Sequence, residues 1–174
     1  MELKIGINKN VQKFRHYISE IKSTIDPDSW EWVKSTSVWN VRQWDYDINL
    51  MIMKSALPAG KLQLWDVSFE VGFSTTMTGK GQSNIIFAWV IERVLEFMNS
   101  VKPDGIVYTA NKGERSRVDA YKTMTRIVLR KLKDYERVDI GEGGGKGYPF
   151  YLVKSKKIDS NTEQNLIKHN NNYA

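Results

Sequence analysis

Apolar residues recur along this chain at two spacings, one typical of helices and the other of strands. Steps of three and four residues mark one buried face of a helix, and they occur over 9–24, 83–100 and 116–132. Alternating or continuous short apolar runs predict strands over 48–52, 62–73, 105–110, 136–140 and 148–153. This mixture predicts an α/β fold in which helices flank a sheet.

The strand predicted over 62–73 changes phase along its length. Its apolar side chains fall at even positions as far as Leu64 and at odd positions from Val67 onward. A slip of one residue moves the later side chains to the other face of a sheet, and a β-bulge produces such a slip. We therefore expect a bulge at Trp65-Asp66, with backbone groups left available to a ligand.

Residues 78–81, Thr-Gly-Lys-Gly, connect that strand to the helix predicted over 83–100. A glycine loop at a helix N-terminus leaves unpaired backbone N–H groups, which favour an anionic group such as a phosphate. The sequence thus predicts a site for a pyrophosphate-bearing ligand at Gly79 and Gly81. An ordinary turn is the alternative, since a Gly-x-Gly pair alone is a weak signal.

Length and composition indicate one folded domain, with 174 residues of which 41% are hydrophobic and 11% aromatic. We expect this domain to span 1–154, and the Asn- and Lys-rich residues 155–174 to form a polar tail. No apolar run approaches the length of a membrane span, and the first ten residues lack a signal-peptide pattern. An intracellular location is therefore expected.

The chain has no cysteine, which excludes a thiol nucleophile, a disulfide and cysteine-ligated metal sites. Its histidines, His16 and His169, lie near opposite ends of the chain, with no acidic residue at the spacing of a metal motif. Neither a metal centre nor a Ser-His-Asp triad is expected.

The net charge of +6 is concentrated in residues 112–137, which carry nine basic and four acidic side chains. Lys122, Arg126 and Arg130 recur every four residues and form one stripe of the helix predicted over 116–132. A solvated helix face, a nucleic-acid contact and a contact with an acidic protein all remain open. Steep salt dependence of binding would distinguish nucleic acid.

The order of elements over 62–153 resembles the C-terminal part of the GCN5-related N-acetyltransferase (GNAT) fold. Thr76-Met77-Thr78-Gly79-Lys80-Gly81 stands where the family has its pyrophosphate loop, although Thr76 replaces the usual Gln or Arg. Asn111 follows the next strand, and Arg117-Val118-Asp119-Ala120-Tyr121-Lys122 lies in the next helix, as in the family. Residues 87–132 also look like small GNAT-like proteins of tailed bacteriophages.

The resemblance implies a GNAT-like single domain, α/β (α+β) in class, with a mixed, twisted central sheet. It implies acetyl-CoA as the cofactor, and no metal. The residues that would hold the cofactor are Gly79, Lys80, Gly81, Gln82 and Asn111.

The same resemblance implies catalytic roles for two residues. Tyr121 falls at the place of the family's general acid, and Glu70, with Asp66 nearby, lies on the strand that often carries the base. Each residue has an alternative reading from its pattern. Tyr121 lies on the apolar stripe of its helix and would then be a packed core residue, whereas Glu70 would face solvent on an alternating strand.

Two functions therefore remain open. One is acetyl-CoA-dependent acetyl transfer to an amine of a protein or small molecule. The other is a non-enzymatic phage accessory protein on the same fold, either a virion component or a host-factor-binding protein, located in the host cell cytoplasm or the virion. Residues 30–48 and 112–137, rich in aromatic and basic side chains respectively, would then contact the protein partner.

Overall fold

A computed structural model describes residues 30–72, 83–111, 113–141 and 147–172 of the chain. Within this part of the chain one sheet has seven strands in the order β1-β2-β3-β4-β5-β7-β6. The strands are β1 (Trp30–Lys34), β2 (Val38–Gln43), β3 (Ile48–Lys54), β4 (Leu64–Val71), β5 (Gly105–Asn111), β6 (Tyr135–Val138) and β7 (Gly147–Lys154). The helices are α2 (Ser83–Val101), α3 (Arg115–Lys131), the short η2 (Ser155–Lys157) and α4 (Thr162–Asn171).

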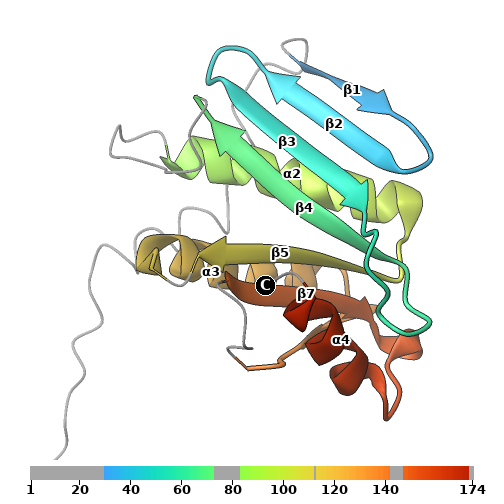
Figure 1. The fold of residues 1–174 in the computed structure, drawn as a ribbon. Coiled ribbons are helices and arrows are strands. Elements are labelled where there is room, and N and C mark those ends of the chain that lie inside the picture. The colour runs from blue at the N-terminus through green and yellow to red at the C-terminus, as the bar shows by residue number, and fades with distance from the viewer. Residues whose placement is uncertain (1–29, 73–82, 112, 142–146, 173–174) are drawn as a thin grey trace, which may run out of the picture.

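The sheet is mixed (Figure 1). Strands β1 to β4 form an antiparallel meander, and β5, β7 and β6 form a second antiparallel group. The two groups meet at β4 and β5, which are parallel and paired from Leu64–Gly105 to Asp66–Val107. Parallel neighbours need a crossover, and α2 supplies it.

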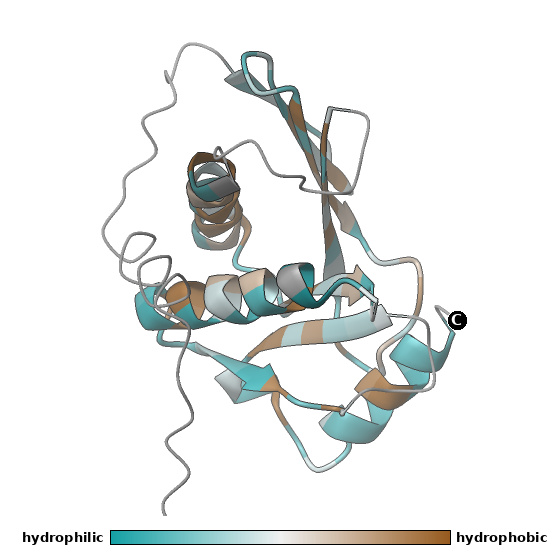
Figure 2. Cartoon of the chain, turned by 90° about the vertical axis from the view of Figure 1, so that its left-hand side faces the viewer, coloured by the Kyte–Doolittle hydropathy of each residue, from teal (hydrophilic) through white to brown (hydrophobic). Residues whose placement is uncertain are grey.

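Helices cover both faces of the sheet, and each face has its own core. In Figure 2, α2 and α3 lie on one side of the sheet and α4 on the other. The larger core joins the sheet to α2 and α3 and includes Trp89 and Phe97 of α2 and Val128 of α3. The smaller core joins the sheet to α4 through Leu166, which packs with Tyr151 and other residues of the strands. We call these faces the inner face (α2 and α3) and the outer face (α4).

The α/β fold class predicted from the sequence is confirmed, and so are the mixed sheet and the predicted order of elements from β4 to β7. The apolar periodicity located α2 and α3 to within about one residue at each end. The helix predicted over 9–24 lies outside the described residues. Among the described residues, no helix has both the length and the apolar character needed to cross a membrane.

The predicted bulge at Trp65-Asp66 is wrong. Residues of β3 and β4 pair one to one from Ile48–Val71 to Lys54–Trp65 without an inserted residue. The apolar phase changes because both faces of the sheet are covered where β4 begins. Leu64 belongs to the small core under α4, whereas Trp65 belongs to the large core on the inner face.

The polar tail predicted over 155–174 is also wrong for the residues that the structure describes. They form η2 and then α4, a helix of ten residues whose Thr162, Leu166, His169 and Asn170 are buried. Only one of these buried residues is apolar, so the sequence shows no helical repeat of apolar residues here. Polar side chains supply the rest of the contact.

Candidate functional site

A wedge opens between β4 and β5 beyond the last residue pair that joins them. Their pairing ends at Asp66–Val107, although β4 continues to Val71 and β5 to Asn111. Figure 1 shows the two strands diverging from their common start. An edge that lacks a neighbouring strand presents backbone N–H and C=O groups that an extended ligand can pair with. The wedge can therefore hold such a ligand between two facing strand edges, one from β4 and one from β5.

A pocket of about 430 Å³ lies at the point of divergence. Its polar lining comes from Asp66 and Ser68 of β4, Thr109 of β5, Tyr151 of β7 and Asn170 of α4. Val67 and Tyr108 also line it, although their side chains belong to the inner-face core. The side chains of the other lining residues lie on the outer face or come from α4, so the pocket opens on the outer face of the sheet, beside α4, where the wedge begins.

Tyr121 of α3 lies on the inner side of the wedge. Its ring packs edge-on against Phe69 of β4, with centroids 6.1 Å apart, and against Tyr108 of β5, with centroids 5.1 Å apart. The side chain is 5% exposed. Burial raises the pKa of Tyr121 to about 12, against the opposing effect of the Arg117 guanidinium. The hydroxyl is therefore protonated at neutral pH.

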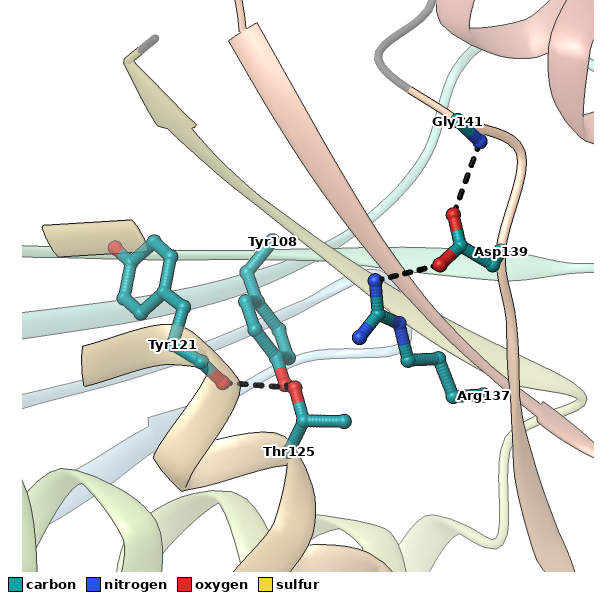
Figure 3. Close-up of polar contacts among 6 residues, drawn as sticks. All are labelled: Tyr108, Tyr121, Thr125, Arg137, Asp139 and Gly141. Carbon is teal, nitrogen blue, oxygen red and sulfur yellow. Dashed lines mark hydrogen bonds and ion pairs between the residues drawn. The ribbon is translucent and has the colours of Figure 1, made fainter. Parts of the chain in front are cut away.

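A hydrogen-bonded chain fixes α3 against β5 beside Tyr121 (Figure 3). The Tyr108 hydroxyl bonds to the Thr125 hydroxyl, which donates to the backbone carbonyl of Tyr121 at 2.8 Å. Burial raises the pKa of Tyr108 well above its usual range, so this hydroxyl also stays protonated. The position of Tyr121 relative to the wedge is thus held by polar contacts as well as by packing.

His169 of α4 supports the outer wall of the pocket. Its Nδ1 lies 2.8 Å from the Tyr151 hydroxyl and its Nε2 lies 3.0 Å from the Ser55 hydroxyl. Burial lowers the pKa of His169, with the nearby Asp66 carboxylate opposing the shift. The ring is therefore neutral at pH 7, with one nitrogen donating and the other accepting. This network orients Tyr151, which lines the pocket.

Asn170, next to His169, lines the same pocket and is 5% exposed. Its side-chain Nδ2 is buried and has no hydrogen-bond partner among the residues that the structure describes. Burying a donor without a partner destabilises the folded state, and such groups are rare in native structures. An orphaned donor on the wall of a pocket marks a position where a ligand can accept a hydrogen bond.

The residues predicted from the sequence fall at several places. Glu70 is exposed on the outer face of β4, opposite Asn49 of β3, and Asn111 is exposed at the end of β5. Tyr121 and Asp66 border the wedge, as described above. Gly79, Lys80, Gly81 and Gln82 lie outside the described residues. The roles assigned to all of these residues stay predictions.

Lys122, Arg126 and Arg130 are all exposed along α3. Lys122 forms an ion pair with Asp119 at 3.7 Å, one turn before it in the helix. The solvated face, the nucleic-acid contact and the acidic partner therefore stay predictions, as does the non-enzymatic function.

Sequence reasoning missed the contribution of α4 to the site. His169 is separated from Ser55 by 114 positions and from Tyr151 by 18, and Asn170 reaches the pocket from the same helix. No local spacing links these residues, because α4 brings them together only by docking on the sheet. In the sequence, His169 and Asn170 follow Leu166 by three and four residues, which puts all three on one helix face. This spacing is the sequence signal that could have indicated a docked helix.

No family model matches this chain, and neither does any curated protein. Solved structures that are similar to it at low identity include the following two. One is a chimera of spermidine N-acetyltransferase SpeG from Vibrio cholerae and hSSAT, with 9% identity, 86% of this chain and 93% of that chain covered, and a TM-score of 0.38. The other is RimJ from Mycobacterium smegmatis in complex with CoA-disulfide. It has 12% identity and a TM-score of 0.34, and the match covers 92% of this chain and 84% of that chain. The assignment of an α/β fold with a mixed sheet rests on the strand order and register of this chain, not on these two structures.

Proposed function

We propose that this chain binds acetyl-CoA in the wedge between β4 and β5 and transfers the acetyl group to an amine. The observation that carries the proposal is the wedge, where two parallel strands separate after Asp66–Val107. The order of elements around it is the one that the GNAT resemblance implies.

The wedge fits the chemistry of the coenzyme. The pantetheine arm of coenzyme A is extended and carries amide groups, so it can pair with strand edges much as a short peptide does. The facing edges of Val67–Val71 in β4 and of Tyr108–Asn111 in β5 would hold this arm. Gly79 to Gln82 follow β4 in the sequence and would hold the pyrophosphate.

Three groups would take part in the reaction, one from the coenzyme and two from the chain. When bound, acetyl-CoA supplies a thioester whose carbonyl carbon is attacked by the amine. Asp66, which lines the pocket, would accept the proton that the amine must lose, and the protonated Tyr121 hydroxyl would donate one to the departing sulfur. The Tyr121 ring contacts Phe69 of β4 and Tyr108 of β5, on the two strands that border the wedge, and this supports the proposed role of its hydroxyl. Asp66 is assigned as the base because it lines the pocket, whereas Glu70 faces solvent.

Calorimetric titration with acetyl-CoA and with CoA tests the proposal. We expect binding at micromolar affinity, weakened at least about tenfold by Gly81→Glu, because an added carboxylate repels the pyrophosphate. The matched control is Thr36→Glu, which adds the same charge to the exposed turn between β1 and β2. This control is expected to bind as the wild type does.

The absence of heat and of thermal stabilisation at millimolar coenzyme would contradict the proposal, since a ligand that binds the folded state must raise its stability. Equal weakening by Gly81→Glu and Thr36→Glu would contradict the assignment of the pyrophosphate to the loop.

A further inference from the structure

We propose that the pocket at the wedge binds an amine that carries a neighbouring carbonyl group, such as the free N-terminus of a peptide. The orphaned Nδ2 of Asn170 and the carboxylate of Asp66, which line one cavity, carry this inference. It extends the proposed function, because the bound amine would be the acceptor of the acetyl group. The binding itself is independent of the coenzyme.

The carboxylate side of the pocket recognises the cation. Asp66 is half-buried on the outer face of β4 and lines the pocket together with Ser68. A carboxylate in partly dehydrated surroundings attracts an ammonium group more strongly than an exposed one does, and it accepts charge-assisted hydrogen bonds. Among the described residues that line this pocket, none is a lysine or an arginine, so the wall itself does not repel a cationic ligand.

The amide side of the pocket recognises an acceptor. Asn170 Nδ2 can only donate, so its missing partner must be an oxygen or a similar acceptor. The carbonyl oxygen of a first peptide residue stands next to its α-amino group and supplies this acceptor. The hydrogen bond would also remove the unfavourable free energy of leaving a buried donor unpaired.

The same geometry disfavours a simple diamine. A second ammonium group has no lone pair for Asn170 Nδ2, and Asp66 is the one carboxylate among the described residues of the pocket wall. The cavity of about 430 Å³ falls within the range of ~300–1,000 Å³ typical of small-ligand sites. Met53 and Val107 add apolar surface for a small side chain. The pocket therefore fits the first residues of a peptide.

Titration of the coenzyme-free protein, followed by backbone amide chemical shifts, tests the inference. The probes are alanyl-alaninamide, its N-acetylated form, isopropylamine and 1,4-diaminobutane. We expect the free dipeptide amide to bind at least about tenfold more tightly than each of the other three. The largest shifts should fall on residues around the pocket.

Two variants separate the two recognition groups. Asp66→Asn should weaken binding of the dipeptide amide and of isopropylamine alike, since both are cations. Asn170→Leu should weaken the dipeptide amide about tenfold and leave isopropylamine unchanged, since isopropylamine has no carbonyl. The control Glu163→Gln removes a charge from an exposed position of α4 and should change neither affinity.

Stability supplies a second readout for Asn170. Replacing an unpaired buried donor by an apolar side chain of similar size should leave the free energy of unfolding unchanged or raised. Weaker peptide binding without loss of stability therefore supports a role in recognition. Unchanged affinity in Asn170→Leu, or tighter binding of the diamine than of the dipeptide amide, would overturn the inference. Because the coenzyme is absent from this experiment, failure here is distinct from failure of acetyl-CoA to bind.

Discussion

His169 shows how much one polar side chain can do in this fold. It is fully buried, and it joins α4 to β7 through Tyr151 and to Ser55, the residue that follows β3. Both hydrogen bonds can be made by a neutral imidazole. The lowered pKa of His169 follows from the burial that these contacts require.

The pH dependence of stability should reflect this residue. Because the folded pKa lies below the ordinary value of 6.5, the unfolded chain binds the proton more readily. The contribution of His169 is therefore complete above about pH 6.5 and decreases as the pH falls from there to the folded pKa. Urea unfolding between pH 7.5 and 5.5 should show this decrease in the wild type.

His169→Gln should flatten that profile while lowering stability by about 1–3 kcal/mol at pH 7.5, since two buried hydroxyls lose this partner. Equal slopes for the wild type and the variant would mean that other groups set the pH dependence.

At the scale of the element, α4 links stability to the site. Leu166 fills the small core of the outer face, while the same helix carries His169 and Asn170 to the pocket. In Figure 2 the helix beside the C-terminal mark is mostly hydrophilic, with a narrow apolar band. Docking of this band positions the polar side chains, so a loss of packing at Leu166 should also disturb the pocket.

Leu166→Ala should lower the free energy of unfolding by about 2–5 kcal/mol, because it removes fully buried methyl groups and leaves a cavity. The neighbouring exposed position supplies the control, and Lys168→Ala should change stability by less than about 0.5 kcal/mol. Denaturant titration of both variants measures the difference. A change of similar size in both would show that α4 is not docked through Leu166.

The elements that the sequence predicted well are those with a wide apolar stripe. Helix α2 repeats buried positions from Ile86 to Met98 and was located almost to the residue. Helix α4 was missed, because Leu166 is its one buried apolar residue and its other contacts are polar. The change of apolar phase after Leu64 suggested a bulge. A slip in strand register and burial of both sheet faces give the same apolar pattern, so the sequence alone cannot distinguish them.

At the scale of the whole molecule, the site exists because two antiparallel groups of strands meet in a short parallel contact. The pairing between β4 and β5 extends over three residue pairs, from Leu64–Gly105 to Asp66–Val107. Beyond it, Tyr121 packs on the inner side, and the pocket opens among Asp66, Thr109 and Asn170. Neither the wedge nor its lining follows from local sequence patterns, since both depend on how far β4 and β5 remain paired.

Backbone amide hydrogen exchange, with and without acetyl-CoA, tests the central claim most directly. If the coenzyme pairs with the wedge, exchange should slow at amides within 67–71 of β4 and 108–111 of β5 that point toward it. Amides of β1 and β2, at the far edge of the sheet, serve as the internal reference and should be unaffected. Saturation with acetyl-CoA and no slowing along either edge of the wedge would contradict the account.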